Sequence, residues 1–156
     1  MNLEELINQE KLKTIKGISI LQIRKRINLA KKYFGFAKKC FEYNPEEYGE
    51  VIYTNLYNAA RVLSETALLI YGYKAALIDH HKVVIQAAKL LINDNRLGEV
   101  FDRLDKMRKE RHNIDYDIHT PFISKQINDQ SIKDIQKYID KLEELVNKND
   151  PQKKFL

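Results

Sequence analysis

The sequence predicts an all-α protein, an antiparallel bundle of four to five helices. Apolar residues recur at steps of three and four through most of the 156 residues, and this spacing places side chains on one face of a helix. No segment alternates apolar and polar residues over the length of a strand. The breaks between the helical segments are short, which favours antiparallel neighbours. We therefore expect a single domain over residues 1–156, with a core bundle at about 20–146 and a polar tail at 147–156.

The first half of the chain is expected to form two long helices. One runs from about Ser19 to Tyr43 and ends at Asn44-Pro45, because proline disfavours helical geometry in the residue before it. Pro45 is then expected to be the first residue of the next helix, which Gly72 ends as a cap. A short helix at about 3–12 is expected to precede both. The inward stripes of the two long helices are Ile20, Ile23, Ile27, Ala30, Phe34, Ala37 and Phe41, and Ile52, Leu56, Ala59, Leu63, Ala67 and Ile70.

The second half is expected to contain three more helices. Asp79 is a candidate N-cap for the third, which Asn93-Asp94-Asn95 ends, and the fourth runs from about Leu97 to Tyr116. The polar stretch 124–131 is interpreted as a surface insertion or a solvated first turn of the last helix. The inward residues are Val84, Ala87, Ala88 and Leu91 of the third helix, Val100, Leu104 and Met107 of the fourth, and Ile132, Ile135, Ile139, Leu142 and Val146 of the last.

Composition and charge exclude several classes of protein. A single cysteine, Cys40, excludes an intramolecular disulfide framework and a cysteine-clustered zinc site. No apolar run approaches the length that spans a bilayer, and no signal peptide or Gly-rich phosphate loop is visible, so we expect a cytoplasmic protein without a membrane partner. The net charge of +5 comes from residues 11–39, which hold ten basic and no acidic residues. The rest of the chain holds seventeen basic and twenty-two acidic residues.

Arg111 interrupts the inward stripe of the fourth helix. The stripe proceeds through Leu104 and Met107 at steps of three and four, and Arg111 occupies its next position, before Ile114. Because an unpaired buried charge costs several kcal/mol, Arg111 either has a carboxylate partner or faces a cleft. An ion pair with Glu65 or with Asp115 is the structural interpretation.

The residues around Arg111 add a chemical interpretation. Arg108, His112 and Asp115 share a helix face, and cations beside a histidine suit phosphodiester chemistry, because the cation stabilises phosphoryl charge while the histidine moves a proton. A charge-dense helix end is also typical of a solvated face. The polar strip Tyr53, Tyr57, Arg61 and Glu65 is most simply an interhelical hydrogen-bonding strip. Adjacent His80 and His81 point about 100° apart, which disfavours chelation of one metal.

These motifs resemble the HEPN domain family, in the branch that ends in Asp-Tyr in place of the usual histidine. The second helix carries Tyr57-Asn58-Ala59-Ala60-Arg61 and later Gly72, similar to the family's alanine-rich helix that ends in glycine. The third helix opens with His80-His81. The fourth ends in Arg111-His112-Asn113-Ile114-Asp115-Tyr116, and Ile123-Ser124-Lys125 looks like the lead-in to the last helix. The resemblance covers roughly residues 20–146.

The resemblance implies a four- or five-helix bundle that forms a homodimer and needs no metal or cofactor. Active members are ribonucleases whose motif of Arg, a polar residue and a later His meets its copy across the dimer, and the RNA 2′-hydroxyl is the nucleophile. Many are toxins paired with a small nucleotidyltransferase antitoxin, and others are non-catalytic. Arg111 matches the motif arginine and His112 the polar residue. Tyr116 stands where the motif histidine is expected at its shortest spacing, and His119 lies one residue beyond the usual range.

Three functions follow as hypotheses. In the first, the protein is a ribonuclease or RNA-binding toxin component, with Arg111, His112, Tyr116 and His119 as catalytic candidates. In the second, it is a non-catalytic helical module that binds a nucleotide or a partner nucleotidyltransferase. In the third, residues 11–39 of an interaction bundle bind an anionic surface, electrostatically and with salt dependence. The candidates for binding the substrate are Arg108, Asp115, Arg61 and Glu65.

Overall fold

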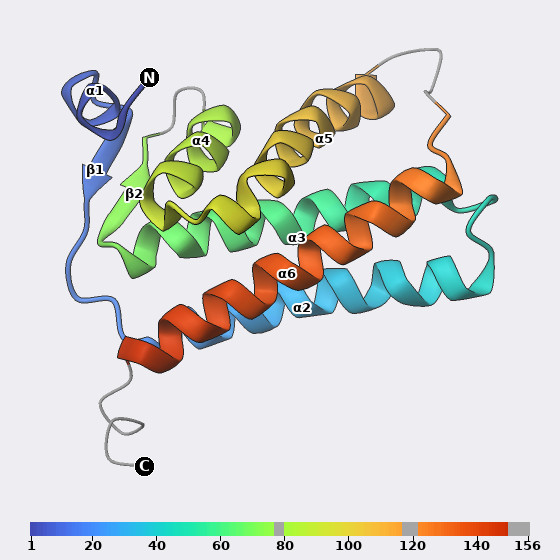
Figure 1. Ribbon diagram of the computed structural model, residues 1–156, viewed down its shortest axis with the longest axis horizontal. Coiled ribbons are helices and arrows are strands. Elements are labelled where there is room, and N and C mark those ends of the chain that lie inside the picture. The colour runs from blue at the N-terminus through green and yellow to red at the C-terminus, as the bar shows by residue number, and fades with distance from the viewer. Residues whose placement is uncertain (77–79, 117–121, 150–156) are drawn as a thin grey trace.

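The computed structural model describes residues 1–76, 80–116 and 122–149, and this part of the chain is mostly helical. Six α-helices pack together and a small two-stranded sheet lies at one end (Figure 1). The prediction of a helical protein is confirmed, whereas the expected total of four to five helices was too low and the sheet was not expected. The elements are α1 (Leu3–Asn8), β1 (Leu12–Thr14), α2 (Ile20–Tyr43), α3 (Gly49–Ile70), β2 (Tyr73–Ala75), α4 (His80–Ile92), the 3₁₀ turn η1 (Asn95–Leu97), α5 (Gly98–Tyr116) and α6 (Lys125–Asn149).

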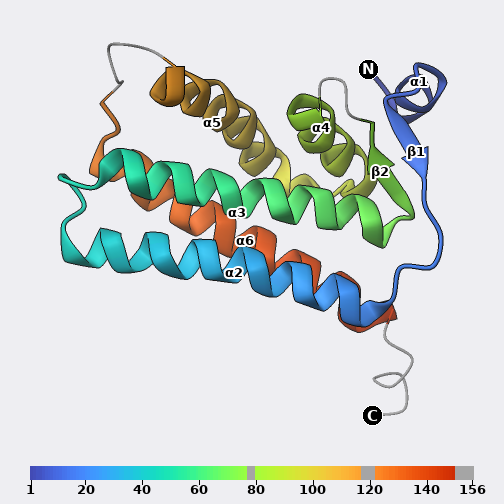
Figure 2. The same ribbon diagram turned by 180° about the vertical axis from the view of Figure 1, so that it is seen from behind.

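α3 is the central helix of the fold. It packs against α2, α4, α5 and α6. In both views α2 lies on one side of α3 while α4 and α5 lie on the other, and α6 crosses in front of α2 and α3 in Figure 1 and behind them in Figure 2. The buried residues of α3 include small and large apolar side chains alike, among them Ala59, Ala60, Leu63 and Leu68. Every helix in the described ranges is too short or too polar to cross a membrane.

The limits of α2 agree with the sequence. Ser19 caps its N-terminus, since its hydroxyl accepts from the amide of Gln22 while the Gln22 side chain accepts from the amide of Ser19. The helix ends at Tyr43, as expected. The prediction that Pro45 opens the next helix is wrong, because residues 45–48 form a turn and α3 begins at Gly49. Asn44 shapes that turn by accepting from the amide of Glu47.

The polar start of α6 contributes two side chains to the core. Asn128 and Ser131 are buried, and the Asn128 amide donates to the Gly49 carbonyl over 2.9 Å. A Cβ at position 49 would stand 2.7 Å from the Ile123 carbonyl oxygen, so α3 begins in direct backbone contact with the segment that leads into α6. The stretch 124–131 is therefore not a surface insertion. Its residues 125–127 are exposed in the first turn of α6, as the other interpretation expected.

The two strands form an antiparallel pair with Leu12 opposite Ala75. α1 ends at Asn8, earlier than the expected limit near residue 12, so that β1 can reach β2. Gly72 follows the C-cap of α3 with φ of 83°, a conformation that favours glycine, and its carbonyl accepts from the amide of Ile15. The expected role of Gly72 at the helix end is confirmed.

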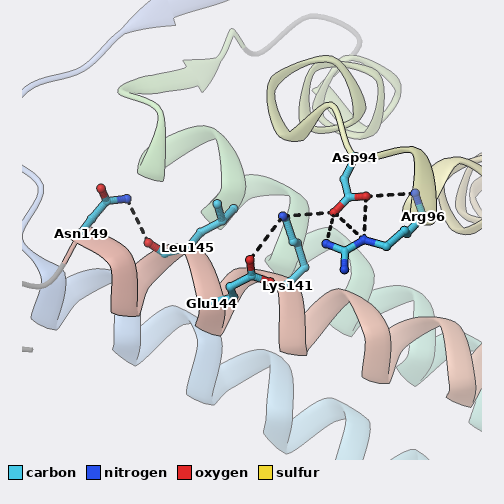
Figure 3. A network of polar contacts seen from close by, with 6 residues as sticks. All are labelled: Asp94, Arg96, Lys141, Glu144, Leu145 and Asn149. Atoms are coloured by element: carbon cyan, nitrogen blue, oxygen red, sulfur yellow. Dashed lines mark hydrogen bonds and ion pairs between the residues drawn. The ribbon is translucent and has the colours of Figure 1, made fainter.

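A polar clamp joins the α4–α5 connection to α6 (Figure 3). Asp94 caps η1 by accepting from the Arg96 amide, pairs with the Arg96 guanidinium at 2.7 Å, and also accepts from Lys141 of α6 at 3.1 Å. Both Asp94 and Lys141 are largely buried, whereas the Arg96 side chain is exposed. Asp79, the expected cap of α4, lies outside the described residues.

Candidate functional site

Glu65 joins three helices through its carboxylate. It accepts a hydrogen bond from Arg61 four residues earlier on α3 at 3.0 Å, from Arg26 of α2 at 2.5 Å and from His80 Nε2 of α4 at 3.1 Å. Its side chain is 18% exposed. The interpretation of the polar strip of α3 as an interhelical strip is confirmed for Glu65, and Arg26 brings residues 11–39 to the edge of the site.

The charge of Glu65 is favoured by its surroundings. Burial raises the pKa of Glu65, but the hydrogen bond from His80 and the positive charges of Arg61 and Arg26 outweigh burial. The pKa is therefore below its ordinary value of 4.5. One carboxylate thus accepts hydrogen bonds from two guanidinium groups and an imidazole. Because it cannot pair with every N–H of these groups, some of their N–H donors remain available.

Arg111 stacks on the face of Tyr57. Its guanidinium carbon lies 5.3 Å from the centre of the Tyr57 ring, and its Nε lies 3.6 Å from Asp115 Oδ2 as a loose ion pair. Of the two carboxylates proposed as partners, Asp115 is the one that pairs with Arg111. The Nε–H of Arg111 is buried and has no hydrogen-bond acceptor among the described residues. The phenol ring therefore holds this guanidinium through a cation–π contact, with little loss of hydrogen-bonding capacity.

Three arginines act electrostatically on the phenol of Tyr57. Burial raises the pKa of Tyr57, and the positive charges of Arg111, Arg108 and Arg61 offset part of this rise. Arg61 comes from α3 and the other two from α5. Arg108 is held by Asp105 at 3.2 Å and is mostly buried. Of the three arginines, Arg111 is the one that stacks on the ring, whereas the other two are each paired with a carboxylate of their own helix.

His81 of α4 contacts the same tyrosine. The ring centres of His81 and Tyr57 are 6.5 Å apart, and the His80 ring lies edge-on to that of His81 at 5.6 Å. Partial burial lowers the pKa of His81, and the positive charges of His80, Arg61 and Arg111 lower it further. Its ordinary pKa is 6.5, so the imidazole is neutral at pH 7 and has a nitrogen that can accept a proton.

Arg111 is the predicted catalytic residue that contacts Tyr57. His112 and Tyr116 are exposed and their rings contact each other at 4.8 Å along α5. His119 lies outside the described residues. The histidine that contacts Tyr57 is His81, whose role the sequence left open. Its only sequence signal was the polar pair at the start of α4, since no local spacing relates it to Arg111.

A cavity of about 230 Å³ opens beside the Glu65 carboxylate. It lies where α2, α3, β2 and α4 meet, and its volume exceeds what a single phosphate group needs. Apolar and charged side chains line this cavity together. The apolar residues are Leu68, Leu69, Ala75 and Val84, and the others are Arg26, Lys74, His80 and Glu65.

Among the residues that the structure describes, no three His, Cys, Asp or Glu side chains lie close enough together to hold a metal ion. No family model matches the chain, and no curated protein is detectably similar to it.

Proposed function

We propose that the protein is a HEPN-like RNA-binding protein, in which the cluster formed by Arg61, Arg108, Arg111, Tyr57 and His81 holds a phosphodiester. One observation carries the proposal: Arg111 stacks on the Tyr57 ring, which His81 also contacts, and the positive charges of Arg61 and Arg108 act on the same phenol. Guanidinium groups bind phosphate oxygens through paired N–H donors, and a stacked guanidinium keeps those donors in a fixed plane.

Cleavage is the activity that this arrangement supports best. Arginines stabilise negative charge that develops on phosphoryl oxygens, and a neutral imidazole accepts a proton. Both groups contact Tyr57, since Arg111 stacks on its ring and the His81 ring lies 6.5 Å from it between centres. In this proposal His81 takes the role that the resemblance assigns to a histidine of the same helix as Arg111. The RNA 2′-hydroxyl is the nucleophile in the family that the motifs resemble. The proposed reaction is therefore transfer of the phosphodiester to the 2′-oxygen.

The resemblance also supplies the proposed biological setting. It favours a homodimer and a toxin component paired with a nucleotidyltransferase antitoxin. The packed helical fold and the agreement of α2, α3, α5 and α6 with the helices expected from the motifs support the HEPN-like part of the proposal.

Removal of Arg111 tests the proposal. We expect Arg111→Ala to weaken binding of a single-stranded RNA by about tenfold, because one charge-assisted phosphate contact is lost. Binding is measured by fluorescence anisotropy on a 2′-O-methyl oligonucleotide, which lacks the nucleophile and so reports binding without cleavage. Lys109→Ala is the matched control, because Lys109 is 64% exposed on the same helix and its loss changes the net charge equally.

Two outcomes separate the alternatives. Equal loss in Arg111→Ala and Lys109→Ala contradicts a phosphate site at Arg111. Binding of a mononucleotide that depends on Arg111, with no binding of RNA, favours the non-catalytic nucleotide-binding module. That module is also supported by the position of His112, whose ring lies against Tyr116 on the exposed face of α5.

A further inference from the structure

Six of the seven basic residues of α2 occur as three adjacent pairs spaced by seven residues. The pairs are Arg24-Lys25, Lys31-Lys32 and Lys38-Lys39. Seven residues are 20° short of two helical turns, so the first members of the pairs share one face of α2. The second members share another face, about 100° away. The two sets are Arg24, Lys31 and Lys38, and Lys25, Lys32 and Lys39.

The first set is directed toward α6 and along α2. Lys31 pairs with Glu143 of α6, and Arg24 donates to Asn147 of the same helix. Lys38 lies over the Phe34 ring at 5.3 Å. These three cations have partners that stabilise the fold.

The second set lies on the face of α2 that turns away from α6. Lys25, Lys32 and Lys39 are exposed, and no ion pair joins them to the described residues. Arg26, the remaining basic residue of α2, pairs with Glu65 of α3. The buried residues of α2 lie on the opposite side of the helix from the three lysines, which are therefore a line of charges along its outer face with no ion pair to the described residues.

Exposed apolar side chains alternate with these lysines. Leu21, Leu29, Phe36 and Tyr43 are 62%, 39%, 52% and 80% exposed. Together the two kinds of residue follow one another at steps of three and four along a single helix face, which we call the α2 stripe: Leu21, Lys25, Leu29, Lys32, Phe36, Lys39 and Tyr43.

We propose that the α2 stripe binds single-stranded RNA, as a contact surface separate from the cluster at Tyr57. This inference rests on the proposed function and adds the substrate class. Single-stranded nucleic acid presents phosphates and unstacked bases in alternation, and proteins bind it with cations that follow the backbone and aromatic rings that stack on bases. The stripe supplies both, with Lys25, Lys32 and Lys39 for phosphates and Phe36 and Tyr43 for bases. A duplex hides its base faces and leaves these rings without partners.

The test compares the two sets of cations at equal net charge. One variant changes Lys25, Lys32 and Lys39 to Gln, and the matched control changes Arg24, Lys31 and Lys38 to Gln. Binding of a 2′-O-methyl oligonucleotide of about 16 nucleotides is measured by anisotropy across a salt series. We expect the first variant to bind at least about tenfold more weakly and its slope against log salt to fall by about 2, because three phosphate contacts are lost. The control is expected to change binding less than about threefold.

The aromatic residues are tested separately, with Phe36→Ala and Tyr43→Ala combined. Loss of stacking is expected to weaken binding at least about fivefold with an unchanged salt slope, since no charge is removed. A double-stranded competitor is expected to displace the labelled strand at least about tenfold less well than an unlabelled single strand. Thermal melts check that every variant remains folded.

Several results overturn the proposal. Equal losses in the two triple variants show binding by net charge alone. Polyglutamate that competes as well as RNA identifies an acidic protein as the partner. Sedimentation that shows loss of a dimer in the aromatic variant, with binding per protomer unchanged, assigns the stripe to a second copy. If Arg111→Ala weakens RNA binding and the triple lysine variant does not, the α2 stripe is not an RNA-binding surface and the proposed function stands. If the triple lysine variant weakens binding and Arg111→Ala does not, the phosphate site at Arg111 is contradicted.

Discussion

Arg111 illustrates how one residue out of pattern locates a site. Its position on the inward stripe of α5 requires a partner, and the sequence offered the carboxylates of Glu65 and Asp115. The structure gives it a loose pair with Asp115 and a stack on Tyr57. The carboxylate was predictable because it lies four residues away on the same helix. The aromatic ring was not, because Tyr57 lies more than fifty residues earlier and only the packing of α3 against α5 brings it close.

His81 leads to a prediction about proton transfer. In the proposed cleavage its neutral imidazole takes the proton of the 2′-hydroxyl, the 2′-oxygen bonds to phosphorus, and the bond from phosphorus to the 5′-oxygen breaks. The proton returns through solvent to the 5′-oxygen, which leaves a 2′,3′-cyclic phosphate and a 5′-hydroxyl. We expect His81→Asn to lower kcat at least about 100-fold, the usual scale of acid–base catalysis, with binding of the 2′-O-methyl oligonucleotide unchanged.

The measurement is cleavage of an end-labelled RNA between pH 5 and pH 9. His81 has a lowered pKa, so its neutral form persists to lower pH than that of an ordinary histidine, and the wild-type rate is expected to fall only on the acid side of pH 6.5. That acid limb is expected to disappear in His81→Asn. The groups that face His81 are Tyr57, Arg61 and Glu65 of α3, Arg111 of α5 and its neighbour His80. His112→Asn is the control, and a loss in that variant equal to that in His81→Asn contradicts the assignment.

At the scale of elements, the helix lengths and inward faces were predictable and the junctions were not. α2 and α5 were predictable from the period of their apolar residues. Local signals marked helix ends: Ser19 caps the start of α2, and Asn93, whose backbone is left-handed, follows the end of α4. The start of α6 has no apolar period, because its inward positions hold Asn128 and Ser131, whose buried side chains donate to backbone carbonyls. The two strands have three residues each, too few for an alternating pattern to appear in the sequence.

A substitution at Gly49 tests the junction between α3 and the start of α6. A methyl group at position 49 stands 2.7 Å from the Ile123 carbonyl oxygen, and the Gly49 carbonyl is the acceptor for the buried Asn128 amide. The backbone must move apart to admit it, so Gly49→Ala is expected to lower the free energy of unfolding by about 1–3 kcal/mol. Urea denaturation followed by circular dichroism measures this change.

Gly35 is the matched control for that substitution. It also lies in a helix, and nothing stands within 4 Å of its added Cβ. An alanine at position 35 has a higher helix propensity than glycine and meets no steric clash. Gly35→Ala is therefore expected to raise the free energy of unfolding by up to about 1 kcal/mol. Two substitutions of the same chemistry are thus expected to have opposite signs. The same sign in both contradicts the close approach of α3 to Ile123.

For the whole molecule, the candidate site depends on how α4 and α5 are held against the other helices. The cluster takes Tyr57 and Arg61 from α3, His81 from α4 and Arg111 from α5, so its geometry is set by packing between helices. Sequence periodicity identified each helix and the faces of α2, α3 and α5. It could not specify which helices adjoin, because any antiparallel arrangement of amphipathic helices buries the same stripes. The contact between His81 of α4 and Tyr57 could therefore be found only from the structure.

The polar clamp at Asp94 joins the α4–α5 connection to α6. The negative charge of Asp94 is therefore expected to stabilise the fold. The hydrogen bonds from Arg96 and then Lys141 hold the pKa of Asp94 well below its ordinary value of 3.8. A carboxyl with a depressed pKa stabilises the fold fully above 3.8 and loses that effect as pH falls through its folded value. Asp94→Asn keeps an oxygen that can cap η1 but loses both ion pairs, so its Tm is expected to fall by a few degrees at pH 7 and to approach that of the wild type in acid. Asp102→Asn removes a carboxylate whose pair with Lys89 is exposed, and its Tm is expected to stay within about 1 °C of the wild type at each pH. A Tm difference between Asp94→Asn and wild type that is constant from pH 7 to pH 2 would show that the charge of Asp94 does not hold the two parts of the fold together.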